Sequence, residues 1–203
     1  MFSKFICGLF FLVILFASCS ESNENENVYV YANWKERNEA FFNKMYAKAD
    51  SVSHAGSSEW KIIRKWSLQE QFGTQKDNNI VVHVLESHAA EAMPLYTDSV
   101  VVDIQGCLMP TANDEDGYVF YSTFSQKKRD LKSDIFITIS AKGMLMNREI
   151  DGLSTAVQNM HEGDRWKVYV PYNLAFQQQS IASPLIPAYS TLVFDITLVR
   201  IKH

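Results

Sequence analysis

The side chains that most often perform catalysis or bind metals are few and scattered in this 203-residue sequence. No histidine shows metal-ligand spacing, and none has a cysteine or carboxylate placed to share a metal ion with it. The histidines are His54, His83, His88, His161 and His203. The sequence contains no glycine-rich phosphate loop and no Gly-x-Ser-x-Gly turn. It therefore predicts neither a metal ion nor a cofactor.

The N-terminus has the pattern of an export signal. One cation, Lys4, precedes thirteen apolar residues from Phe5 to Ala17. A helix needs about 20 such residues to cross ~30 Å of hydrocarbon. The pattern therefore indicates a signal peptide over residues 1–18 rather than a transmembrane helix.

The end of this signal points to lipidation. Phe16-Ala17-Ser18-Cys19 resembles a bacterial lipobox, which implies that Cys19 is the lipidation site. The alternative is an ordinary secretory signal in which Cys19 is incidental. Residues 19–28 are polar and acidic, so we expect a disordered tether, and they also resemble the export tag of some Bacteroidota lipoproteins. These features predict a cell-envelope protein, lipid-anchored to the outer membrane on its periplasmic or surface-exposed side.

Cys107 and the charged residues offer little further chemistry. Cys107 lies in the apolar run from Val100 to Leu108, so we expect a buried core thiol rather than a nucleophile. A net charge of -4 without a clustered basic face argues against nucleic acid as a partner. The basic run 127–129, followed by Lys132, is expected to be a solvated loop, with contact to an acidic client as the alternative.

The elements that must position any site are mostly strands. A stripe that includes Trp34, Phe41 and Met45 predicts a helix over 34–53, and Asn33 with Glu36 has the spacing of a capping box. A short helix is expected to open at Asp151. Strands are expected over 80–85, 98–108, 118–124, 135–140, 165–170 and 191–201. This content is typical of an α+β fold with an antiparallel sheet.

The most specific pattern is an ordered series of short motifs between Asp98 and Ile201. The motifs are Gly106 with Leu108, Asp116-Gly117, Val119-Phe120 with Ser122, Gly152, Met160 with Gly163, Val170-Pro171, Leu174-Ala175, Ile186-Pro187 and Thr191-Leu192-Val193-Phe194. This series closely resembles the signature of FKBP-type peptidyl-prolyl cis-trans isomerases. The resemblance implies an FKBP-like domain over 91–203, in which a curved antiparallel sheet wraps a short helix. Residues 29–90 would form an N-terminal helix-and-strand extension.

The resemblance also implies an activity and its residues. Isomerases of this family rotate X-Pro bonds, whose twisted transition state is less dipolar than the planar amide and is favoured by an apolar cleft. The implied catalytic residues are Phe120, Tyr121, Ile150, Leu153, Phe176, Ile186 and Phe194. The implied substrate-binding residues are Phe136, Ala175 and Leu185. The implied partners are proline-containing segments of exported proteins.

Four positions depart from the family pattern. Leu153 stands where the pocket floor is usually Trp, and Phe176 replaces a Tyr. Tyr121 replaces an Asp and Ile104 replaces a Tyr, so two side chains that bond each other in the family are both lost. We therefore expect a folding helper of reduced activity. A non-catalytic peptide-binding module and a structural envelope lipoprotein that uses the N-terminal helix are the alternatives.

The N-terminal helix raises the question of oligomerisation. Its apolar stripe is too extensive to face water, so it must pack on its own domain or on another chain. About 20 residues are short for a dimerisation arm. A monomer is therefore the favoured expectation.

Overall fold

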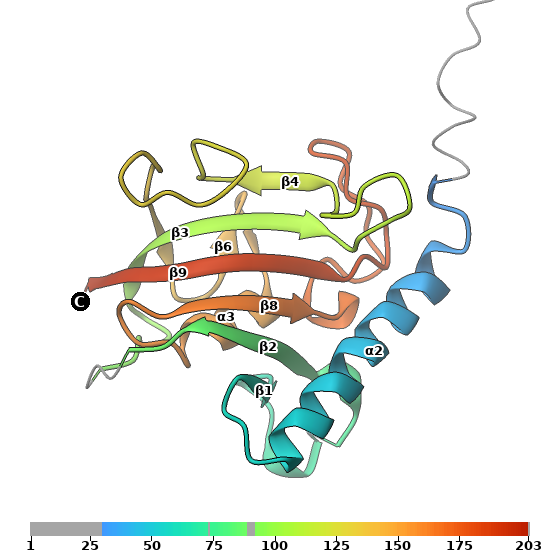
Figure 1. The fold of residues 1–203 in the computed structure, drawn as a ribbon, viewed down its shortest axis with the longest axis horizontal. Helices are drawn as coiled ribbons and strands as arrows, with labels where there is room; N and C mark the ends of the chain where they lie inside the picture. The colour runs from blue at the N-terminus through green and yellow to red at the C-terminus, as the bar shows by residue number, and fades with distance from the viewer. Residues whose placement is uncertain (1–29, 73, 89–91, 203) are drawn as a thin grey trace, which may run out of the picture.

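The computed structural model describes residues 30–72, 74–88 and 92–202. The predicted signal peptide, tether and Cys19 lie outside these ranges. One curved sheet has the spatial order β1-β2-β8-β9-β3-β4, with β5 also paired to β3, and every neighbouring pair is antiparallel (Figure 1). Its strands are β1 Trp60–Arg64, β2 Asn79–Glu86, β3 Ser99–Leu108, β4 Val119–Ser122, β5 Ile137–Ser140, β8 Arg165–Val170 and β9 Leu192–Lys202. The predicted α+β class with an antiparallel sheet is confirmed.

The longest strand pair forms the centre of the sheet. β3 and β9 pair from Ser99 with Lys202 to Leu108 with Leu192. Val100, Val102 and Ile104 alternate along β3, so they lie on one face of the sheet, and they have no exposed surface because this face packs into the main core. β-branched side chains fit such a pleated surface, which explains why this run forms a strand.

The short helix α3 (Asp151–Val157) lies behind the sheet, and every residue after Asp151 in it is buried (Figure 1). A Cβ atom at Gly152 would lie 2.3 Å from Cγ1 of Val170 in β8. Only glycine therefore lets this helix approach the strand so closely. The predicted helix at Asp151 is confirmed.

The long helix α2 (Trp34–His54) covers part of the front face (Figure 1). Phe42 and Ala49 from α2 pack with a cluster from β1, β2, β8 and β9 that contains Trp60, Val81, Tyr169 and Val193. The predicted capping box is wrong, because Asn33 adopts a left-handed conformation and its side chain makes no capping hydrogen bond. Within the described ranges, no helix has the length and apolar character needed to cross a membrane.

Polar side chains fix α2 to the start of β9. The indole Nε1 of Trp34 donates to Oγ of Ser190 at 2.9 Å. The side-chain oxygen of Asn38, which is fully buried, accepts from the backbone N–H of Thr191 at 2.7 Å. The start of the helix is thus set by tertiary contacts in place of a local cap.

Residues 60–86 join the same sheet as the predicted isomerase domain. β2 pairs with β8 from Val81–Tyr169 to Glu86–Arg165, and β1 forms the sheet edge beside β2. The sequence pattern of 60–68 is ambiguous, and the structure resolves it as a strand followed by a turn. The 3-10 helices η1 (Glu70–Phe72) and η2 (Lys76–Asn78) complete the connection to β2.

Candidate active site

Six of the implied site residues belong to the main hydrophobic core cluster, which lies between α3 and the sheet. Phe120 comes from β4 and Phe194 from β9. The others come from the start of α3, from the segment after η3 (Tyr172–Leu174) and from the loop before β9, namely Ile150, Leu153, Phe176 and Ile186. The rings of Phe120 and Phe194 pack edge to face, with centroids 5.9 Å apart and an interplanar angle of 86°.

Local backbone features turn the Phe120 ring into this cluster. Gly106 pairs with Tyr121 and Cys107 pairs with Val119, so Phe120 is the extra residue of a β-bulge. Bulges redirect side chains and are frequent beside functional sites. A Cβ atom at Gly106 would lie 2.6 Å from Cζ of Phe120, so only glycine leaves room for the ring.

The cluster is closed. Ile150, Leu153, Ile186 and Phe194 have no exposed surface. Phe120 and Phe176 are 6% and 8% exposed. A proline ring therefore reaches the four fully buried side chains only when a covering residue moves aside, whereas Phe120 and Phe176 keep a small exposed surface.

The other implied residues lie at the margin. Tyr121 and Ala175 are half-buried against the cluster. Burial raises the pKa of the Tyr121 hydroxyl above its usual value, so at neutral pH the hydroxyl stays protonated and able to donate. Phe136 and Leu185 are 38% and 40% exposed and lie outside the buried cluster.

One hollow adjoins the cluster at Phe176. It has a volume of ≈ 290 Å³ and lies between β7 (Arg148–Glu149) and the segment after η3. Its lining residues are Arg148, Glu149, Ala175, Phe176, Gln177 and Gln179. Polar groups that could bond a peptide carbonyl are therefore present next to Phe176, although the positions that supply them in the family are apolar here.

Sequence reasoning missed the hairpin that carries part of this lining. β6 (Met144–Leu145) pairs with β7, and Met146 and Asn147 between them have φ values of 52° and 59°. Two successive positive φ values are characteristic of a type I′ hairpin turn, and Asn tolerates them well. Asn147 is the sequence feature that could have predicted this turn. Met146 from this turn packs half-buried against the cluster.

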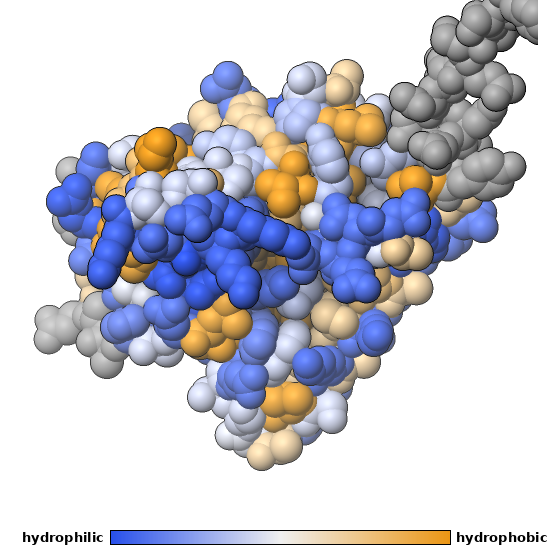
Figure 2. Space-filling view, turned by 45° about the horizontal axis from the view of Figure 1, so that its top comes forward, coloured by the Kyte–Doolittle hydropathy of each residue, from blue (hydrophilic) through white to orange (hydrophobic). Residues whose placement is uncertain are grey.

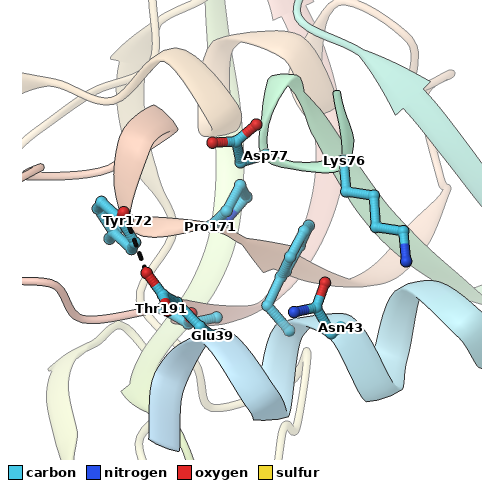
Figure 3. Close-up of a pocket in the computed structure, with 8 residues that line it drawn as sticks. Glu39, Asn43, Lys76, Asp77, Pro171, Tyr172 and Thr191 are labelled. Atoms are coloured by element: carbon cyan, nitrogen blue, oxygen red, sulfur yellow. Dashed lines mark hydrogen bonds between the residues drawn. The ribbon is translucent and has the colours of Figure 1, made fainter. Parts of the chain in front are cut away.

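A second hollow lies between α2, η2 and η3 (Figure 3). Glu39, Asp77 and Tyr172 line it, with Phe42 and Pro171 among the apolar residues. Its polar groups are already satisfied in part, since Tyr172 donates to Oε1 of Glu39 at 3.3 Å and Asn173 donates to Asp77. Among the described residues, no group of three His, Cys, Asp or Glu side chains could hold a metal ion.

Comparison with known proteins identifies the family. The family model for FKBP-type peptidyl-prolyl cis-trans isomerase matches residues 91–199. The outer membrane protein MIP of Legionella longbeachae is 32% identical over 111 residues, which cover 55% of this chain and 40% of that protein. The FKBP-type isomerase FkpA of Escherichia coli K12 is 26% identical over 156 residues, which cover 77% of this chain and 50% of that protein.

The fold also matches a solved structure. A peptidyl-prolyl cis-trans isomerase from Pseudomonas syringae pv. tomato DC3000 superposes with a TM-score of 0.51 at 18% sequence identity. The match covers 81% of this chain and 96% of that one. A sheet wrapped on a short helix, with an apolar cluster between them, thus defines an FKBP-like fold.

The chain belongs to the FKBP-type peptidyl-prolyl cis-trans isomerase family, because the family model spans more than half of it. It spans half or less of the length of the curated relatives that it matches.

Proposed function

We propose that this protein is a peptidyl-prolyl cis-trans isomerase that acts as a folding helper on proline-containing segments of exported proteins. The observation that carries the proposal is the family match over 91–199, whose apolar site positions meet in one cluster. Rotation about an X-Pro bond has a barrier of ~18–20 kcal/mol, and the twisted state is the less dipolar one. An apolar surround therefore lowers the barrier without a nucleophile or a metal.

Reduced activity is part of this proposal. Phe176 carries no hydroxyl that could donate to a substrate carbonyl, and Ile104 and Tyr121 lack the hydrogen-bonded pair that the family has at these positions. The closed cluster adds a second cost, because substrate must displace a side chain before it is enclosed. The missing polar groups and the closed cluster should therefore slow proline binding and bond rotation without changing the fold.

The proposed place of action is the cell envelope. The support is the lipobox-like sequence at Cys19 and the similarity to a protein named as an outer membrane protein. We propose that Cys19 carries the lipid and that residues 19–28 form the tether to the domain.

A protease-coupled assay with a Pro tetrapeptide tests the activity. We expect catalysis above the uncatalysed rate at high enzyme concentration. Phe194→Ala should abolish it, because Phe194 lies at the centre of the cluster. Val193→Ala is the matched control, since Val193 is the neighbouring β9 residue, is similarly buried, and packs on the opposite face under α2. A folded Phe194→Ala protein that retains the parent rate would show that the catalytic site lies elsewhere.

A non-catalytic peptide-binding module is the second candidate, and the missing polar groups at Ile104, Tyr121 and Phe176 favour it. Isothermal titration with the same peptide separates the two functions. Binding without rate enhancement supports the module, whereas rate enhancement that Phe194→Ala removes supports the isomerase.

A further inference from the structure

A separate hollow lies on the front face of the sheet, away from the closed cluster. It has a volume of ≈ 340 Å³ and is formed by β3, β4, β8 and β9 together with the loops around residues 116 and 127. Figure 2 looks toward this side and shows a broad hydrophilic area with apolar side chains among it. The hollow takes no part in the proposed proline chemistry.

Three lysines converge on this hollow, namely Lys127, Lys128 and Lys167. Lys127 pairs with Asp116 at 2.8 Å, but both side chains are largely exposed, so the pair is weak. In the described part of the chain, Lys128 and Lys167 make no ion pair and no side-chain hydrogen bond. Lys127 holds the pKa of Asp116 below its usual value, and Lys167 and Lys128 act in the same direction, so all three charges reach this carboxylate.

The second carboxylate in the lining is already neutralised. Asp195 accepts two hydrogen bonds from the Arg165 guanidinium, at 2.9 and 2.7 Å. Such a bidentate pair is the strong form of a charge-assisted hydrogen bond. The lining therefore carries three lysines against two carboxylates, with Asp114 and Glu115 close enough to act on Lys127 as well. The cationic groups without a carboxylate partner among the described residues are the ammonium groups of Lys128 and Lys167.

The floor of the hollow is apolar and neutral. Cys107 and Val193 are almost fully buried there, and Val119 is 44% exposed. Burial raises the pKa of the Cys107 thiol to about 11, so the thiol stays protonated at neutral pH. The surface thus offers apolar contact below and cations at the rim.

We infer that this hollow binds an acidic peptide segment of a client protein, with an apolar side chain on Val119 and Val193 and carboxylates on Lys128 and Lys167. Charge complementarity selects the occupant, because a basic or neutral segment would leave both lysines unpaired. Val119 and Phe120 are consecutive in the edge strand β4, and they face the hollow and the proline cluster respectively. A client could therefore contact both surfaces across one edge of the sheet.

The test is fluorescence anisotropy with the full chain carrying Cys19→Ala to keep it unlipidated. The probe is a fluorescein-labelled peptide without proline, in which glutamates flank two leucines, and its counterpart has Gln at each Glu. Lys167→Glu and Lys128→Glu should each raise Kd about fivefold or more, and the Gln peptide should bind correspondingly weakly. Lys132→Glu is the matched control, since Lys132 is an exposed lysine of the same basic loop outside the hollow.

Two results would overturn the inference. One is equal binding of the Glu and Gln peptides, or equal Kd values for the two hollow variants and Lys132→Glu. The other is that the protein binds vesicles with 30% anionic lipid, loses this binding in Lys167→Glu, and does not bind the peptide. That result would make the surface a lipid site. Because the probe lacks proline, neither result bears on the proposed isomerase activity.

Discussion

Phe176→Tyr tests whether missing polar groups limit the proposed isomerase. The substitution restores the hydroxyl that the family carries at this position and changes nothing else in the ring. Phe176 is 8% exposed and borders the hollow beside Arg148 and Glu149, so the para position has a polar space within reach. A hydroxyl there can remain hydrated in the free enzyme and can donate to a substrate carbonyl when peptide is bound.

The size of the effect follows from the value of one hydrogen bond. A neutral hydrogen bond contributes ~0.5–1.5 kcal/mol, which corresponds to a rate increase of about two- to twelvefold if it forms in the transition state. A hydroxyl that pointed into the apolar cluster would instead lower the free energy of unfolding by roughly 1–3 kcal/mol, because it would be buried without a partner. Urea denaturation separates these two orientations.

The assay is kcat/KM for a Pro tetrapeptide, measured for the parent, Phe176→Tyr and Phe176→Leu. We expect the Tyr variant to be faster and the Leu variant, which removes the ring, to be slower. If the Tyr variant keeps the parent stability and is no faster, hydrogen bonding at this position does not limit the reaction. The low activity would then have to come from the closure of the cluster.

Three further predictions concern anchoring, assembly and pH. Cys19→Ala should move the protein from the membrane fraction to the soluble extract, and unchanged partitioning would refute lipidation there. The unlipidated protein should be a monomer by light scattering, because α2 packs on its own sheet; a clean dimer would contradict this. Burial raises the pKa of Asp103 above its usual 3.8, so the native state holds this proton more tightly than the unfolded chain. Stability of the parent should therefore fall as pH rises from about 4 through the raised pKa, and Asp103→Asn should remove that part of the decline in urea titrations at pH 4 and 8. Identical slopes for parent and variant would contradict the assignment.

The strands and the short helix could be predicted because their signals are local. β3 and β9 are long β-branched runs, and Gly152 marks the close approach of α3 to Val170. The start of α2 could not be predicted from its capping pattern, because the Trp34 and Asn38 side chains reach residues more than 150 positions away. A capping pattern of a few neighbouring residues cannot predict contacts so far apart in the sequence.

The candidate site could likewise be predicted only in part. The residues that meet in the cluster follow from the ordered motifs, since each motif fixes a position on a known element. Its closure does not follow, because burial depends on how the β6–β7 hairpin and Phe176 pack, and none of the ordered motifs lies between Ser122 and Gly152. The front hollow likewise arises from β3, β8 and β9 side by side, so the basic loop alone gave no means to choose between a solvated face and a binding surface.

Two residues N-terminal to the family match help to position the candidate site. Nζ of Lys65, just after β1, lies 2.7 Å from Oδ2 of Asp151, the first residue of the helix that carries Leu153. Trp34 at the start of α2 binds Ser190 at the base of the loop before β9. The helix and the loop that enclose the cluster are therefore both held by residues outside the family match. The four buried residues of α2 (Trp34, Asn38, Phe42 and Ala49) all pack within one chain, and the residues that the helix exposes are mostly polar or charged. This is the physical basis for expecting a monomer.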